Sequence, residues 1–257
     1  VNNLAPLLTV AGTIFAYFSI LIISFGDFSR YVKNEQELKK GNLSLILNLI
    51  IFSFLSVFIV TGSDVFLNQK FSDIDRIFTN PTDIVGKFDN IQITIVVLFF
   101  IIIASASTNL VANFIPSQYS LINFAPSILS LKSASYLIAF FGLLIAIFWL
   151  TILSQIGILS FVDTFGAFFG PLFGVMAADY YLIKNQELSN KDLYSIDKES
   201  AYYYSGGWHI KGVYSLIIGF IFSASTIWNT NLMFLQSGAW IIGAFFAWIT
   251  YYLLAKK

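Results

Sequence analysis

The chain contains no cysteine, only one histidine and few charged residues, which make up 11% of its 257 positions. The lack of cysteine excludes disulfides, thiolate metal sites and cysteine nucleophiles. Soluble domains carry about 25% charged residues, so this chain has too few polar side chains to cover a surface that faces water. Its 14 basic residues are balanced by 14 acidic ones, which leaves no basic field for nucleic acid. We therefore expect no nucleic-acid partner.

Long apolar runs take the place of charge, because 57% of the residues are hydrophobic. A helix needs about 20 mostly apolar residues to cross the hydrocarbon of a bilayer. Seven stretches qualify, namely 5–26, 43–63, 91–114, 135–153, 156–178, 212–228 and 234–254. None of them alternates polar and apolar residues as a transmembrane strand does. The sequence predicts an all-α, polytopic protein with seven transmembrane helices in the lipid bilayer.

Basic residues are distributed unevenly between the two sides of the predicted membrane. One side receives Arg30, Lys33, Lys39, Lys40, Lys132, Lys184, Lys191, Lys198, Lys211, Lys256 and Lys257. The other side receives Lys70, Arg76 and Lys87. This positive-inside bias predicts a protein of the cytoplasmic membrane with a cytoplasmic C-terminus. Seven spans then place Val1 on the opposite side, and we expect further spans before it.

Two polar connections carry additional patterns. Within 65–90, apolar residues recur at helical spacing before Pro81, which predicts a short amphipathic helix in the membrane interface. The segment from Leu182 to Lys211 is polar and rich in tyrosine, as segments near the membrane interface are. The one histidine, His209, lies in this segment, and its position suggests no functional role.

Asp163 is the only acidic residue well inside a predicted span, and the predicted spans place no lysine or arginine beside it. Placing a charged carboxylate at that depth costs several kcal/mol of free energy, unless the group is protonated. Such residues usually have a function, so Asp163 is a candidate for substrate binding or proton coupling. The alternative is a carboxyl group that hydrogen-bonds a neighbouring helix and faces a wet cavity. Acid–base catalysis would need a second carboxylate or a nucleophile–base pair, which the spans do not offer. We therefore expect no enzyme.

The third span contains a small polar cluster among isoleucine, valine and phenylalanine. Ala104, Ser107 and Thr108 are spaced i, i+3, i+4 and share one helix face. Two hydroxyls with a backbone carbonyl suit a hard cation, although ordinary helix packing also enriches such residues. Asn109 and Asn113 share another face, and their amides match the edge of an amide-like heterocycle. Interhelical hydrogen bonding is the alternative for the two amides.

Glycines mark two further spans. Gly166, Gly170 and Gly174 recur every four residues around Pro171, which predicts close contact between helices. In the first span, Gly12-Thr13 precedes an aromatic pair and favours an unwound point there. Aromatic rings beside such a break can stack on a planar ligand, or they can simply be packing.

Several strings together resemble one transporter family. Ser24 to Lys33 reads SFGDFSRYVK, Ser107 to Asn113 reads STNLVAN, Asn123 to Pro126 reads NFAP, and Gly170 to Ile183 reads GPLFGVMAADYYLI. Their order and spacing are similar to those of the nucleobase:cation symporters of the first NCS family, the purine/cytosine permease-like proteins. The resemblance implies a twelve-helix carrier built from two inverted five-helix repeats.

In that scheme the chain supplies helices six to twelve. Residues 1–183 would form the second inverted repeat, 184–211 a cytoplasmic loop and 212–257 two peripheral helices. The first five helices of the same protein would be the missing partner, and the chain alone should not transport.

The resemblance also implies roles for individual residues. The carbonyl of Ala104 and the hydroxyls of Ser107 and Thr108 match sodium-ligand positions. Asn113 matches an asparagine that hydrogen-bonds the substrate, and Val162 falls near the extracellular gate.

The first span departs from the family pattern at two positions. Phe18 stands where many members have a tryptophan that stacks on the heterocycle, and Ala16 stands where glycine is usual. Together with its neighbour Tyr17, Phe18 remains the expected stacking residue.

The expected function is secondary active import of a nucleobase or related heterocycle, such as cytosine, uracil, allantoin or a hydantoin. Na⁺, or failing that H⁺, would be the coupling ion, and no other cofactor is expected. A related carrier for an amino acid, a vitamin or another small solute is the alternative, for which an acidic residue such as Asp163 would be the discriminating feature. A receptor or channel on the same fold would bind ligand without uphill uptake.

Overall fold

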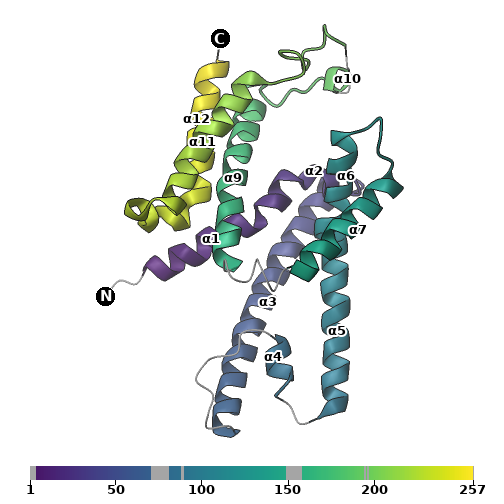
Figure 1. The fold of residues 1–257 in the computed structure, drawn as a ribbon, viewed down its shortest axis with the longest axis vertical. Coiled ribbons are helices and arrows are strands. Elements are labelled where there is room, and N and C mark those ends of the chain that lie inside the picture. Colours follow the sequence, from purple (N-terminus) through teal and green to yellow (C-terminus); the bar gives the residue numbers. More distant parts are fainter. Residues whose placement is uncertain are drawn as a thin grey trace. The chain divides into compact units, whose positions relative to one another are not determined.

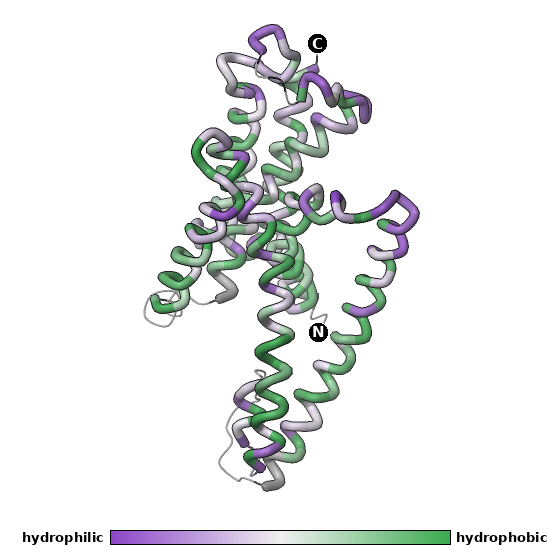
Figure 2. The backbone as a smooth tube through the Cα atoms, turned by 90° about the vertical axis from the view of Figure 1, so that its right-hand side faces the viewer, coloured by the Kyte–Doolittle hydropathy of each residue, from purple (hydrophilic) through white to green (hydrophobic). Residues whose placement is uncertain are grey.

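The computed structural model describes residues 4–70, 81–87, 90–148, 158–193, 195 and 197–256. Over these residues it contains helices, turns and one isolated bridge between Ser205 and Trp208, and no strand. Seven helical segments are long and apolar enough to cross a membrane, which confirms the predicted all-α, polytopic fold. Apolar residues run along the helices, and polar residues gather at their ends and connections (Figure 2). Most of the predicted interfacial helix lies outside the described residues.

The chain divides into two compact units, Val1–Phe25 with Phe140–Lys257 and Gly26–Ala139. Its main helices are α1 (Leu4–Ile23), α2 (Phe25–Ser29), α3 (Glu35–Lys70), α4 (Pro81–Val85), α5 (Ile91–Asn109), α6 (Ile115–Phe124), α7 (Leu131–Phe148), α9 (Ile158–Ala178), α10 (Asn190–Leu193), α11 (Ile210–Trp228) and α12 (Ala239–Ala255). Among the described residues there are also two π-helical turns, η1 (Leu110–Phe114) and η3 (Asp179–Ile183), and a 3₁₀ segment, η4 (Thr230–Gly238).

The second span begins earlier than its apolar run. The Asn34 side chain accepts a hydrogen bond from the Glu37 amide over 2.9 Å, and so caps the start of α3. Glu35 and Lys39 form an i, i+4 ion pair of 2.7 Å in the first turns. These polar interactions allow the helix to start at residue 35 rather than 43.

The first span is a continuous helix, so the predicted unwound point at Gly12 is wrong. Gly12 is buried against η4, where a Cβ atom added to it would lie 1.7 Å from the carbonyl oxygen of Ser237. The glycine is therefore explained by close packing of α1 and not by a break in the helix.

The third span is longer than predicted and contains a π-helical turn. Asn90 caps its start by accepting hydrogen bonds from two backbone amides over 3.1 Å each. α5, η1 and α6 then follow without a break to Phe124. Pro116 has no N–H for the turn before it and its ring crowds that turn, which accounts for the loosened hydrogen bonding at 110–114.

In the unit that contains both termini, α9 packs against α1, α11 and α12 (Figure 1). An added Cβ at Gly174 would lie 2.1 Å from the carbonyl oxygen of Ala244 in α12. At Gly170 it would lie 2.3 Å from the carbonyl oxygen of Trp240, and at Gly166 it would lie 2.4 Å from a side chain of α1. The predicted close contact at these three glycines is confirmed.

We expect Gly174→Ala to destabilise the protein, because the new methyl group would collide with backbone, and overpacking typically costs about 1–3 kcal/mol. Gly142→Ala is the matched control in another span, where an added Cβ meets nothing within 4 Å. Thermal unfolding of the detergent-solubilised protein that contains this chain would measure both. Equal melting temperatures for the two variants would contradict the packing described for α9.

Candidate functional site

The predicted cation-ligand residues lie on an exposed part of α5. The Ser107 hydroxyl donates a hydrogen bond of 3.0 Å to the carbonyl oxygen of Ala104, so these two oxygens are neighbours, as the spacing predicted. Thr108 is the next residue and is also exposed. None of the 19 residues of α5 is buried in its unit. Two oxygens at this separation can ligate one cation, and rotation of the hydroxyl would release the carbonyl for it.

The two predicted amides lie next to each other on the same span. The Asn113 amide donates to the side-chain oxygen of Asn109, and the Asn109 amide donates to the carbonyl of Ser105 over 2.9 Å. Asn113 belongs to the π-helical turn η1, which the sequence analysis did not predict although Pro116 signals it. π-turns are frequent at functional sites because they shift the angular position of the residues that follow.

Asp163 lies in the second turn of α9 and is half-buried. Its carboxylate accepts a hydrogen bond of 3.0 Å from the Gln236 amide of η4. The hydroxyl of Thr13 in α1 also hydrogen-bonds to it. Three elements therefore meet at this carboxylate. Neither Gln236 nor Thr13 was predicted as a partner of Asp163. The one sign of each in the sequence is that a polar residue stands within an apolar span.

The other candidate residues of this unit lie on α9 and α1. Val162 is half-buried at the preceding position of α9. Tyr17 and Phe18 are adjacent in α1, and their rings meet edge to face with 5.3 Å between centroids. Tyr17 is 64% exposed, whereas Ala16 is buried against Gly166. The aromatic pair is thus available for stacking on the side of α1 that is not packed on α9.

The eight candidate residues divide between the two compact units. Those on α5 and η1 belong to Gly26–Ala139, and those on α1 and α9 belong to the other unit. Within each unit the structure pairs Ser107 with Ala104 and Tyr17 with Phe18.

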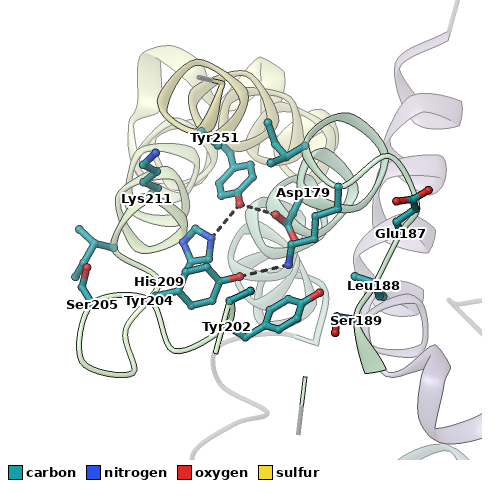
Figure 3. A pocket seen from close by; sticks show the side chains of 15 residues that line it. Asp179, Glu187, Leu188, Ser189, Tyr202, Tyr204, Ser205, His209, Lys211 and Tyr251 are labelled. Carbon is teal, nitrogen blue, oxygen red and sulfur yellow. Dashed lines mark hydrogen bonds and ion pairs between the residues drawn. The ribbon is translucent and has the colours of Figure 1, made fainter. Parts of the chain in front are cut away.

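A polar cluster at the end of α9 was not predicted. We call Asp179, Lys184, Tyr204, His209 and Tyr251 the Asp179 cluster. Figure 3 labels each of these residues except Lys184. These residues line a cavity of about 690 Å³ formed by η3, the following loop and the adjoining ends of α11 and α12. His209, for which the sequence suggested no role, caps α11 by accepting a hydrogen bond from the Gly212 amide.

The lysine of this cluster is held by a carboxylate. Lys184 lies 3.1 Å from the Asp179 carboxylate and 3.9 Å from the centre of the Tyr202 ring. Burial lowers the pKa of Lys184, but the hydrogen bond to Asp179 and the charge of that carboxylate raise it by more, so the pKa lies above its ordinary value. The ammonium group therefore stays charged beside Asp179 at neutral pH.

Comparisons with known proteins identify the family. The model of the permeases for cytosine/purines, uracil, thiamine and allantoin matches residues 2–243. The chain is 27% identical to an allantoin permease of Bacillus subtilis over 95% of the chain and 48% of that protein. It is 26% identical to a purine-uracil permease of Arabidopsis thaliana over 80% of the chain and 33% of that protein.

A third relative is a hydantoin permease of Microbacterium maritypicum, 28% identical over 55% of the chain and 28% of that protein. The chain spans about half the length, or less, of these relatives. No solved structure matches it closely enough to add to these comparisons. The family and the relatives are transporters and not enzymes. The chain belongs to the family of permeases for cytosine/purines, uracil, thiamine and allantoin.

Proposed function

We propose that the chain is part of a cation-coupled secondary transporter that imports a nucleobase or a related heterocycle of the cytosine, uracil, allantoin and hydantoin class. The observation that carries this proposal is the family match over residues 2–243. The relatives are named for allantoin, purines with uracil, and hydantoin. Uracil, hydantoin and the hydantoin ring of allantoin share an edge that alternates N–H donors with carbonyl acceptors.

The substrate would be held by amide hydrogen bonds and ring stacking. The Asn113 amide offers a donor and an acceptor, which complement an N–H beside a carbonyl. Phe18, with Tyr17 beside it, would stack on the face of the ring. Asp163 would accept a hydrogen bond from a ring N–H, and Val162, the preceding residue, would lie near the extracellular gate.

The coupling cation would bind on α5, to the carbonyl of Ala104 and the hydroxyls of Ser107 and Thr108. The 3.0 Å separation of the first two oxygens supports this assignment. A cation needs more ligands than these three, so the remaining oxygens would come from outside this face. We assign them to the five preceding helices of the same protein, which the length of the relatives supports. The C-terminus would be cytoplasmic, as the distribution of basic residues indicates.

A carrier for a different small solute, such as an amino acid or vitamin, is the second candidate. The hydrogen bonds that Asp163 accepts come from an amide and a hydroxyl, which do not neutralise a carboxylate. A cationic substrate would do so, and the family description includes thiamine, which is a cation.

Uptake of labelled uracil, cytosine, allantoin and hydantoin by cells that express the gene encoding this chain would test the proposal. We expect concentrative uptake of one compound in Na⁺ buffer and little in K⁺ buffer. The Ser107→Ala/Thr108→Ala variant should lose the Na⁺-dependent part, because it lacks two ligand oxygens.

The matched control is Ser53→Ala/Thr61→Ala in α3, whose hydroxyls also bond their own helix, over 2.7 Å each. It should transport normally. Na⁺-dependent uptake that survives in the α5 variant would refute the cation assignment, and uptake of thiamine alone would favour the second candidate.

Asp163→Asn should raise the KM for the heterocycle by about tenfold, equivalent to about 1.4 kcal/mol, because a charge-assisted hydrogen bond to the ring is lost. The amide can still accept from Gln236 and Thr13, so the fold should be retained. Initial rates of uptake give the KM, and Asp197→Asn in the polar loop serves as the control. Uptake that persists in K⁺, collapses with a protonophore and disappears in Asp163→Asn would instead show proton coupling at this residue.

A further inference from the structure

Residues 24–33, which read SFGDFSRYVK, have no role in the proposed binding site. In the structure they include α2 and the turn that follows it, at the end of the first span. Asp27 and Arg30 form an i, i+3 ion pair of 3.1 Å, in which the Arg30 side chain is 47% exposed. Tyr31, the next residue, is 65% exposed. The end of this span therefore presents a guanidinium group and a phenol hydroxyl side by side.

Both groups contact the same residue of α6. The guanidinium group of Arg30 lies over the ring of Tyr119, 4.2 Å from its centre, which is a cation–π contact. The hydroxyl of Tyr31 is hydrogen-bonded to the hydroxyl of Tyr119. All three residues belong to the compact unit Gly26–Ala139. Tyr119 is thus held at its ring face and at its hydroxyl, and we call Arg30, Tyr31 and Tyr119 the tyrosine tether.

Tyr119 lies on the same helical run as the candidate cation ligands. α5, η1 and α6 follow one another without a break, so Thr108, Asn113 and Tyr119 occur in order along one span. The π-helical turn η1 precedes Tyr119 and sets its angular position, because one residue more or fewer would turn its side chain by about 100° around the helix axis. A displacement of α5 on cation binding would be carried along this run to Tyr119.

The other half of the tether follows the helix that carries the candidate stacking residue, Phe18. α2 begins after a single non-helical residue, Ser24, whose amide still donates to the carbonyl of Ile20 over 2.9 Å. The chain passes from one compact unit to the other at Phe25. The tether therefore attaches the segment that directly follows α1 to the span that contains α5.

This attachment bears on how two ligands could affect each other. A cation strengthens the binding of a substrate only where both ligands favour the same arrangement of the protein. The candidate cation ligands and Phe18 belong to different compact units, so their arrangement depends on what holds the chain between them. The tether residues are not among the candidate ligands. They would act by holding helices in place and not by touching either ligand.

We propose that Tyr119 is a positioning residue that couples the cation to the heterocycle: through Arg30 and Tyr31 it ties the end of the first span to the span that binds the cation. The inference rests on the proposed function, because it concerns how the cation and the substrate of that carrier affect each other. Residues that touch neither ligand can change such a coupling severalfold. Loss of the tether weakens the coupling and leaves each site able to bind its own ligand.

Equilibrium binding of a labelled heterocycle to the purified full-length protein tests this proposal. The probe is whichever of uracil, cytosine, allantoin and hydantoin the uptake assay selects. The Kd in K⁺ buffer divided by the Kd in Na⁺ buffer is the coupling factor, and it does not depend on the amount of folded protein. We expect Tyr119→Leu to lower this factor at least about threefold, mainly by weakening the binding in Na⁺.

A milder variant and a matched control accompany the leucine variant. Tyr119→Phe keeps the ring beside Arg30 but loses the hydrogen bond to Tyr31, so its coupling factor should lie between those of the unchanged protein and Tyr119→Leu. It also keeps the test decisive if the leucine variant folds poorly. Tyr136→Leu replaces a 67% exposed tyrosine of α7 in the same compact unit and should leave the factor unchanged.

The proposal is overturned if both Tyr119 variants keep the coupling factor of the unchanged protein. It is also overturned if Tyr136→Leu lowers the factor as much as Tyr119→Leu does, since the loss would then be general. Failure of the proposed function has a different sign, which is that the unchanged protein binds none of the four compounds or binds them equally in Na⁺ and K⁺. In that case the present inference fails with it.

Discussion

The unit formed by Val1–Phe25 and Phe140–Lys257 depends on one constraint, the close approach of α9 to the backbones of α1 and α12. In a bilayer there is no hydrophobic force to press helices together, so contact has to come from tight packing and a few hydrogen bonds. Gly170 and Gly174 allow this contact along the middle of α9. The register that they fix brings Asp163 to Gln236 near one end of the helix, and Asp179 to Tyr251 at the other. Each of these carboxylates is thus bonded to elements other than α9 itself.

The polar residues of α5 behave differently, because they bond mainly within their own span. Ser107 donates to Ala104, Asn109 donates to Ser105, and Asn113 donates to Asn109. A membrane helix whose polar groups are satisfied internally does not need a polar neighbour. Such groups can exchange an internal partner for a cation or a heterocycle at little cost, since the hydrogen bond lost is replaced by one of similar strength. This property suits a face that must bind and release.

The features that the sequence predicted are those that depend on neighbours along the chain. Apolar runs located the seven spans, and four-residue spacing located the glycine contacts of α9. Pairings between distant residues left no such pattern: Gln236 lies 73 positions from Asp163, and Tyr251 lies 72 positions from Asp179. The role of Gly12 was misread because a glycine in a helix signals either a break or a close contact, and only the partner, Ser237, decides between them. The roles of Phe18 and Asn113 remain predictions, because they depend on a ligand.

The two ends of α9 differ in chemistry, and the helix connects them. The partners found at Asp163 are an amide and a hydroxyl, neither of which titrates near neutral pH, whereas the Asp179 cluster contains an imidazole. In the proposed function, substrate acts at the first of these ends. A ligand that distinguishes two positions of the same helix is linked to any other ligand that does so, and each changes the affinity for the other by the same factor. A ligand bound at the Asp179 end would then alter heterocycle affinity only as far as it shifts α9 at Asp163, so the glycine contacts between the two ends determine the size of the effect.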